Sequence, residues 1–466
     1  MKLKQPAVFS IAVLLLTLSA TFSVRADNVD RIVLERMKEQ NIPGAAVAVI
    51  KNGKTVKVKG YGIASLEFGV PVSTDTVFEI GSVSKQMTAA AIMILVEDGK
   101  VRLDEKISAY LPGTPDAWKD VTVRHLLTHT SGIKSYTSLT GFELSRRVTI
   151  DGFIKQLSPY PLEFTPGEKN IYSNSGYNLL AYIIQTQSGK PYMEFMRERI
   201  FLPLGMTRTG DRDPQFIIPQ RAGGYEWRTD RYVGRDGSLT DLMGAGSITS
   251  TIADMIKWEA ALRGSKFLKP ESKQEIWTQY TLSSGERSVY GFGWRISEVR
   301  GHKLIGHTGQ TAGFGAAILR YIDDDVTVIA LTNLGELGMG NLIASRVAKL
   351  FIPTLSLKFF KKISDHDKNK FELISRALRA RIANESDLSI FTPEFVRTFT
   401  TERSKRTTQL VSSSGAIRAI DVVGFETVGN TRVYRLLSSS EKHVFLWRVT
   451  LDSDGKISDM VLEEYE

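Results

Sequence analysis

The first elements of the chain follow from the spacing of its hydrophobic positions. Residues 30–40 carry apolar side chains at helical spacing among charged ones, and Pro43-Gly44 ends this helix. Residues 45–50 are a continuous apolar run, and Asn52-Gly53 is a strong signal for a two-residue hairpin turn. In residues 55–59 valines alternate with threonine and lysines, which predicts a strand with one face in water. The chain therefore opens as helix, strand, tight turn and strand.

The later pattern predicts a sheet that draws on both ends of one domain. After an apolar helical run, Met87 to Val96, residues 101–209 have mostly helical spacing interrupted by loops. Four strands and a final helix follow, predicted over residues 290–296, 303–307, 313–321, 326–331 and 342–351. We therefore expect an α+β fold, in which an antiparallel sheet is flanked by terminal helices and a helical subdomain is inserted between its halves.

A second, smaller domain is predicted after a change in composition. Basic residues outnumber acidic ones over residues 357–381, which we interpret as a linker that passes into a basic helix. Strand patterns return over residues 416–423, 431–437, 443–451 and 457–462. The expected division is a main domain over residues 27–354, a basic linker over residues 355–370, and a small C-terminal α+β domain over residues 371–466. No motif in this last domain indicates its role.

The first 26 residues are predicted to be a secretory signal. A basic start precedes an apolar run, Ala7 to Leu18, and Val24-Arg25-Ala26 supplies small residues at the positions that signal peptidases prefer. The alternative is an uncleaved N-terminal anchor. No later segment is apolar enough to cross a bilayer, so we expect a soluble mature protein in the periplasm or secreted from the cell.

The net charge and the absence of cysteine limit which partners the protein could bind and which chemistry it could use. The chain has a net charge of +9, and the predicted signal carries three of these charges, which leaves +6. That excess is compatible with contact with an anionic cell wall but is too spread out to indicate nucleic acid. Without cysteine, disulfides and thiolate metal sites are excluded. His125 and His129 lack a third metal ligand, so no metal or other cofactor is predicted, and His129 is expected to bond loop backbone near the cleft.

The chemistry is expected at the turn Ile80-Gly81-Ser82, where a small-residue stretch meets the apolar helical run. Ser82 would lie at or just inside the start of the helix, and Lys85, one turn later, would share its face. A serine hydroxyl becomes a good nucleophile only when a nearby base takes its proton. A lysine can be that base if burial lowers its pKa. Alone, this spacing also fits a capping serine beside a solvated lysine.

Two further stretches remove that ambiguity. Ser82-Val83-Ser84-Lys85, Tyr172-Ser173-Asn174 and His307-Thr308-Gly309 stand in an order and separation that resemble the serine β-lactamase and penicillin-binding-protein superfamily. The match is to the class C branch, which also holds D-alanyl-D-alanine carboxypeptidases, D-aminopeptidases and esterases. Supporting stretches look like this family too, namely the Tyr172 loop and residues 125–132, 244–246, 290–294 and 307–315. The resemblance covers residues 30–351 and implies a β-lactamase/transpeptidase-like fold.

The resemblance implies a role for each motif residue. Ser82 would form an acyl-enzyme, while Lys85 and Tyr172 would share the proton transfers, with Tyr172 acting as a phenolate or as a relay. Asn174, His307, Thr308 and Gly309 would bind substrate, with the last three on an edge strand. The backbone N–H groups of Ser82 and Gln310 would form an oxyanion hole.

One residue departs from the typical class C pattern, which carries lysine where this chain has His307. Histidine has a reference pKa of about 6.5, so if His307 faces a substrate carboxylate we expect binding of acidic ligands to weaken as pH rises from about 5.5 to 7.5. The departure favours an exported serine hydrolase that acts on D-amino-acid peptides or small esters ahead of β-lactams. The competing hypothesis is a non-catalytic relative that binds peptidoglycan or peptides.

Overall fold

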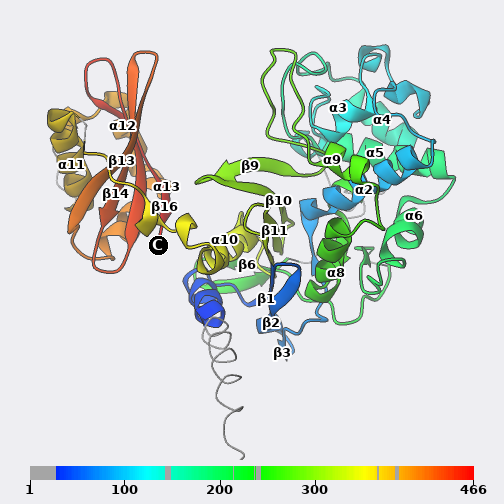
Figure 1. The fold of residues 1–466 in the computed structure, drawn as a ribbon, viewed down its shortest axis with the longest axis horizontal. Helices are drawn as coiled ribbons and strands as arrows, with labels where there is room; N and C mark the ends of the chain where they lie inside the picture. Colours follow the sequence, from blue (N-terminus) through cyan, green and yellow to red (C-terminus); the bar gives the residue numbers. More distant parts are fainter. Residues whose placement is uncertain are drawn as a thin grey trace, which may run out of the picture. The chain divides into compact units, whose positions relative to one another are not determined.

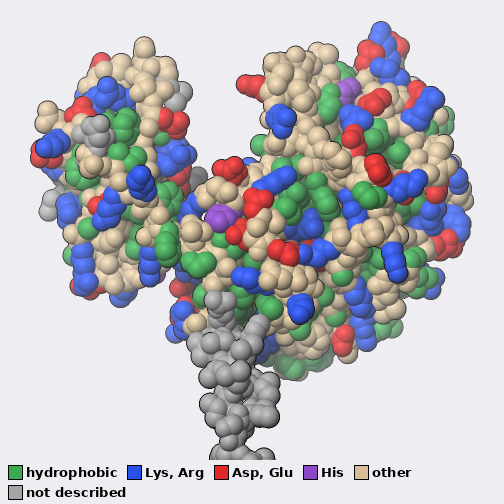
Figure 2. Space-filling model, in the orientation of Figure 1, with side chains coloured by type: hydrophobic (Ala, Val, Ile, Leu, Met, Phe, Trp, Pro, Cys, Tyr) green, Lys and Arg blue, Asp and Glu red, His purple; other side chains and the backbone are tan. Residues whose placement is uncertain are grey.

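The computed structural model describes residues 28–141, 148–213, 215–235, 237, 243–364, 367–383 and 388–466. The predicted signal, residues 1–26, lies outside this part of the chain. The chain divides into two compact units, Met1–Phe351 and Ile352–Glu466. Among the helices that the structure describes, none is long and apolar enough to cross a membrane. On the face of the molecule shown in Figure 2, Lys and Arg side chains lie interspersed with Asp and Glu side chains.

The first unit is built on a seven-stranded antiparallel sheet with the strand order β3-β2-β1-β12-β11-β10-β9 (Figure 1). Its strands are β1 (Gly44–Lys51), β2 (Lys54–Ser65), β3 (Val70–Pro71), β9 (Arg295–Val299), β10 (His302–Gln310), β11 (Gly315–Tyr321) and β12 (Val326–Thr332). β1 pairs with β12 from Ala45 opposite Thr332 to Lys51 opposite Val326. The expected sheet, assembled from both ends of the domain, is confirmed.

The register of β1 separates the two faces of the sheet. Ala46, Ala48 and Ile50 join the large core beside the inserted helices, so the alternating residues point to the opposite face. Lys57 and Lys59 of β2 lie opposite Val49 and Val47 and pair with Asp30. The N-terminal helix, residues 28–39, therefore covers this second face.

α10 (Met339–Phe351) packs closely on β11. A Cβ at Gly340 would lie 2.6 Å from the carbonyl carbon of Ala316, so only glycine allows this approach.

Helices fill the insertion between β3 and β9 (Figure 1). They are α2 (Ser84–Glu97), α3 (Val123–Leu127), α4 (Ile150–Leu157), α5 (Asn174–Ser188), α6 (Tyr192–Met196), α7 (Met243–Gly246), α8 (Ile252–Arg263) and α9 (Pro270–Ile276). Short strands that the sequence pattern missed lie among them: β4 (Phe78–Glu79), β5 (Gly210–Asp211), β6 (Tyr225–Arg228), β7 (Arg231–Gly234) and β8 (Ile248–Ser250). Each of these has four residues or fewer, too few to show a period.

Several expected boundaries are wrong. The strand predicted over residues 290–296 begins only at Arg295, and Tyr290 forms an isolated bridge with Arg295 instead. The cause is Gly293, which has φ +75° and approaches the backbone of Lys85, so the chain turns there. The strand expected over residues 303–307 spans His302–Gln310, and the helix expected over residues 342–351 already begins at Met339.

The second unit has a four-stranded antiparallel sheet in the order β13-β14-β15-β16, and its described residues include three α-helices. The elements are β13 (Ala419–Val428), β14 (Thr431–Ser439), β15 (Val444–Leu451), β16 (Ile457–Tyr465), α11 (Lys368–Ala383), α12 (Pro393–Arg397) and α13 (Glu402–Ser412). Leu436 and Trp447, directly opposite each other in the sheet, share a core with Ile374 of α11 and Val411 of α13. Within the predicted linker, Leu357 is buried beside Leu437 and Leu446.

A buried ion pair holds α8 against the sheet of the first unit. Glu259 is 1% exposed, and its carboxylate lies 2.9 Å from Arg320 Nε of β11 and accepts a 2.9 Å bond from Thr327 Oγ1 of β12. Glu259→Gln leaves Arg320 buried without a negative partner. We expect a loss of about 3–5 kcal/mol in unfolding free energy, measured by urea denaturation.

The exposed pair Arg31–Glu35 provides the matched control. Glu35→Gln should cost less than about 1 kcal/mol, because both charges stay in water. Equal losses in the two variants would contradict the stated role of Glu259.

Candidate active site

Ser82 lies in a 3-10 turn, η1 (Gly81–Val83), between β4 and α2. The turn rests directly on β10: a Cβ at Gly81 would lie 2.7 Å from Gln310 N, and one at Gly309 would lie 1.9 Å from Ile80 O. Side chains at these two positions would push the turn off the strand, so both must be glycine. Ser82 is thereby held at the start of α2 and beside the third motif.

Lys85 lies in the first turn of α2 and is fully buried. Its Nζ lies 3.1 Å from Ser82 Oγ, 2.8 Å from Asn174 Oδ1 and 2.7 Å from Ala245 O. Burial lowers the pKa of Lys85 well below its usual value. A neutral amine that donates its two hydrogens to Asn174 and Ala245 directs its lone pair at Ser82.

Tyr172 also lies within hydrogen-bond reach of Ser82 Oγ. Its hydroxyl donates a 2.8 Å bond to Ser82 Oγ, and Lys85 Nζ lies 4.8 Å from the centre of its ring. The side chain exposes 37% of its surface, but the surrounding protein still desolvates the phenol and raises its pKa above the usual value. Tyr172 is therefore a proton donor near neutral pH, which favours a relay over a phenolate.

Asn174 is the first residue of α5 and connects two of the motifs. While Oδ1 accepts from Lys85, Nδ2 donates to Thr137 Oγ1 at 3.1 Å. Its backbone N–H donates to Ser135 Oγ, also at 3.1 Å. The amide is therefore fixed in one orientation by its neighbours, with its oxygen toward Lys85.

The third motif forms the end of β10. His307 is 6% exposed, and its Nδ1 lies 2.6 Å from Thr308 O, so Nδ1 carries a hydrogen. Burial, assisted by Lys85, lowers the pKa of His307 to about 4. Our expectation of titration near pH 6.5 is therefore wrong, because it assumed a solvated imidazole.

The two backbone amides expected to form an oxyanion hole lie on adjoining segments. A Cβ at Gly309 would lie 3.1 Å from Ser82 N, and one at Gly81 would lie 2.7 Å from Gln310 N. Thr308, which lies between His307 and Gly309 in the third motif, is exposed. The structure thus gathers all eight residues that the sequence singled out.

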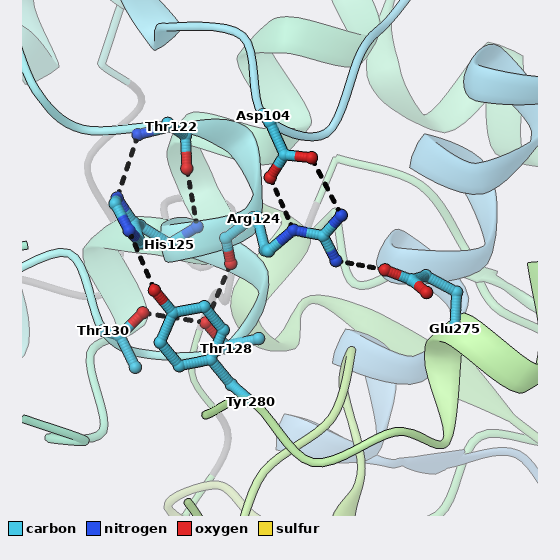
Figure 3. A network of polar contacts seen from close by, with 8 residues as sticks. All are labelled: Asp104, Thr122, Arg124, His125, Thr128, Thr130, Glu275 and Tyr280. Atoms are coloured by element: carbon cyan, nitrogen blue, oxygen red, sulfur yellow. Dashed lines mark hydrogen bonds and ion pairs between the residues drawn. The ribbon is translucent and has the colours of Figure 1, made fainter. Parts of the chain in front are cut away.

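A network of polar contacts surrounds α3 (Figure 3), and His129 in the segment after this helix contacts the Tyr172 loop. In the network of Figure 3, His125 accepts a 3.2 Å bond from Thr122 N at Nδ1, and its Nε2 lies 3.2 Å from Tyr280 Oη. Arg124 pairs with Asp104 and Glu275. The expected bond of His129 to loop backbone is confirmed, because its Nδ1 accepts from Ser173 N at 3.2 Å.

Several contributors were missed from the sequence. Ala245 acts through a backbone carbonyl, which no side-chain motif reveals, although residues 244–246 were part of the resemblance. Ser135 and Thr137 orient Asn174 and carry no signal of their own. Within the described residues, no group of three or more His, Cys, Asp and Glu side chains could hold a metal ion.

Comparisons with known proteins identify the family of this chain. A family model described as Beta-lactamase matches residues 29–350. The chain is 31% identical over 324 residues to penicillin-binding protein 4* of Bacillus subtilis (strain 168), an alignment that covers 65% of this chain and 71% of that protein. It is 30% identical over 299 residues to a D-aminopeptidase of Brucella anthropi, with 62% of this chain and 56% of that protein covered.

Among solved structures, the octameric penicillin-binding protein homologue from Pyrococcus abyssi aligns with a TM-score of 0.61 and 22% identity. That alignment covers 94% of this chain and 98% of the homologue, and it extends the fold likeness into the second unit. The family match spans the residues that build the sheet and the site. The chain therefore belongs to the Beta-lactamase family.

Proposed function

We propose that this chain is a serine hydrolase that works through an acyl-enzyme on Ser82. The observation that carries the proposal is the position of Ser82 Oγ, 3.1 Å from Lys85 Nζ and 2.8 Å from Tyr172 Oη. A nucleophile within hydrogen-bond reach of both a base and a proton donor is the arrangement that acyl transfer requires.

The proton transfers follow from the protonation states. As Ser82 Oγ bonds to the substrate carbonyl carbon, its proton passes to the lone pair of Lys85. Negative charge on the carbonyl oxygen is met by the N–H groups of Ser82 and Gln310, each worth about 2.7–4 kcal/mol in other hydrolases. Tyr172 gives its proton to the leaving amine or alkoxide and regains one from Lys85. Water then releases the acyl group by the reverse path.

For the substrate we propose a D-amino-acid peptide or amide, or a small ester, ahead of a β-lactam. A D-aminopeptidase is among the relatives, and His307 supplies no charge for a substrate carboxylate near neutral pH. β9 pairs with β10 only as far as Gly306. An extended substrate could therefore run along Thr308 and Gly309, with Asn174 on its other side.

We also propose that the protein is exported to the periplasm or the medium, where contact with the cell wall would bring it peptide substrates. The support is the signal pattern of residues 1–26 and the mild positive charge of the remaining chain. N-terminal sequencing of protein from the producing cell would test the cleavage after Ala26.

Ser82→Ala should abolish covalent labelling of the protein by a fluorophosphonate probe, because the attacking oxygen is gone. The measurement is the intensity of the labelled band. Ser84→Ala is the matched control, since Ser84 is two residues away and buried, and it should label like the wild type. Labelling that survives in Ser82→Ala would refute the assignment, whereas binding of peptides without labelling by any acylating reagent would favour the non-catalytic alternative.

Lys85→Arg should lower the labelling rate at least about 100-fold, because a guanidinium stays protonated and cannot accept the Ser82 proton. In the wild type, the rate should rise with pH as Lys85 loses its proton, and this rise should lie well below pH 10.5 because the pKa is lowered. Stopped-flow labelling from pH 4 to 10 measures both effects. A rate that stays independent of pH in the wild type and unaffected in Lys85→Arg would contradict the role of Lys85.

Acidic and neutral ligands should show parallel pH profiles of binding between pH 5.5 and 7.5. With a pKa of about 4, His307 is charged only below that value and is neutral throughout this window. His307→Lys should tighten binding of the acidic ligand relative to the neutral one. The dissociation constants of both ligands are measured in Ser82→Ala to suppress turnover. A selective loss of acidic-ligand binding as pH rises would show that His307 titrates in this window.

A further inference from the structure

His129 holds both backbone amides that flank Tyr172. Its carbonyl oxygen accepts a 3.0 Å bond from Ile171 N, and its Nδ1 accepts a 3.2 Å bond from Ser173 N. These residues lie before α5, which begins at Asn174, so no helical bonds hold them. One residue outside the three motifs therefore fixes the backbone on either side of Tyr172.

The His129 ring also supports the Tyr172 ring directly. The two ring centres lie 4.4 Å apart at an interplanar angle of 35°. Tyr177 and Tyr290 close the pocket around the imidazole, at 5.1 and 5.0 Å between ring centres. His129 is 1% exposed, whereas Tyr172 exposes more than a third of its surface, so Tyr172 depends on this contact for its position more than a core residue would.

The bond from Ser173 determines the tautomer of His129. A nitrogen that accepts an N–H cannot carry a hydrogen, so the proton lies on Nε2 and the ring is neutral. Burial, with Lys85 and His307 nearby, lowers the pKa of His129 well below its usual value, which keeps this acceptor state. His307 has the opposite tautomer, with its hydrogen on Nδ1. Both Nε2 atoms are buried and lack a partner among the described residues.

The backbone conformation of His129 allows its carbonyl oxygen and its ring to accept these two bonds at once. Its φ is +58°, a left-handed conformation that turns the chain after α3 and brings carbonyl and ring to the same loop. Asparagine, like histidine and aspartate, adopts this conformation more often than other residues with a Cβ. Its side-chain oxygen also stands where the Nδ1 of histidine stands, so it can replace the acceptor without replacing the ring.

We propose that His129 is the positioning residue for Tyr172, and that its neutral Nδ1 holds the Tyr172 hydroxyl at bonding distance from Ser82. The inference rests on the proposed function, because it assumes that Tyr172 transfers protons to and from the reacting groups. A shift of about 1 Å at such a hydroxyl can cost on the order of 100-fold in rate. His129 thus acts through Tyr172 and touches no substrate.

The test compares two replacements of His129 by the rate at which fluorophosphonate labels Ser82. His129→Phe keeps an aromatic ring and removes the acceptor, and it should lower the rate about 10- to 100-fold. His129→Asn keeps the acceptor and should lose no more than about threefold, a rescue by the residue that restores the bond. His125→Phe is the matched control: it removes a similar acceptor for Thr122 N in the same segment, and it should label within about threefold of wild type while lowering the melting temperature.

A second background shows whether His129 works through Tyr172. In Tyr172→Phe, which lacks the hydroxyl, adding His129→Phe should lower the labelling rate by less than about twofold. If His129→Phe lowers the labelling rate as much in Tyr172→Phe as in the wild type, the proposal is overturned, because His129 would then act on the fold alone. Equal losses in His129→Asn and His129→Phe would overturn it too. If Tyr172→Phe itself labels at the wild-type rate, the proposed role of Tyr172 fails instead.

A measurement on the wild-type protein does not depend on the variants folding. Nitrogen-15 NMR of the histidine rings should show His129 protonated at Nε2 and His307 protonated at Nδ1, both neutral from pH 5.5 to 8. The His129 signals are assigned by their loss in His129→Asn. Protonation of His129 at Nδ1, in either tautomer or cation, would exclude acceptance from Ser173 and refute the proposal, whatever the outcome of the Ser82→Ala labelling.

Discussion

The burial of the Lys85 side chain is the constraint on which the rest of the site depends. A charged amine at a position without solvent costs several kcal/mol unless it is compensated, and no carboxylate contacts this one in the described residues. Three oxygen atoms surround it instead, from Ser82, Asn174 and Ala245. These come from segments far apart in the chain, so the amine can be accommodated only when α2, α5 and α7 are assembled. The desolvation that makes a charged Lys85 costly also lowers its pKa, and the lowered pKa lets the amine act as a base.

The nucleophile depends on a second constraint, the absence of side chains where η1 meets β10. Gly81 and Gly309 allow two backbones to approach within a distance that any Cβ would prevent. The same approach brings the amides of Ser82 and Gln310 to neighbouring positions. Packing between backbones, which has few alternative arrangements, suits a site in which the donors must be in place before the reaction starts.

Much of the site could be predicted from side chains, and the rest could not because it uses the backbone. Ser82, Lys85 and Tyr172 stand in motifs whose spacing and residue types carry the chemistry. The carbonyl of Ala245 and the left-handed turn at His129 leave no comparable trace in the sequence. The pKa of His307 was also out of reach, because it depends on a burial that no local pattern indicates. For the fold, the long strands of the main sheet were predictable from their apolar runs and, in residues 55–59, from alternation, whereas the short strands β4 to β8 depend on tertiary pairing.

The pairing of β1 with β12 also has a consequence for how the first unit folds. Ala45 finds its partner Thr332 only after the whole helical insertion has been made. Because β1 and β12 are so distant in sequence, their pairing gives the unit a high contact order. A high contact order slows folding, since a long loop must close before the contact forms. During synthesis, β1 can pair with β2 as soon as the hairpin is made, but its other edge stays open until β12 emerges at the end of the unit. Such a delay keeps the first unit incompletely folded for longer than a sheet built from neighbouring strands would be.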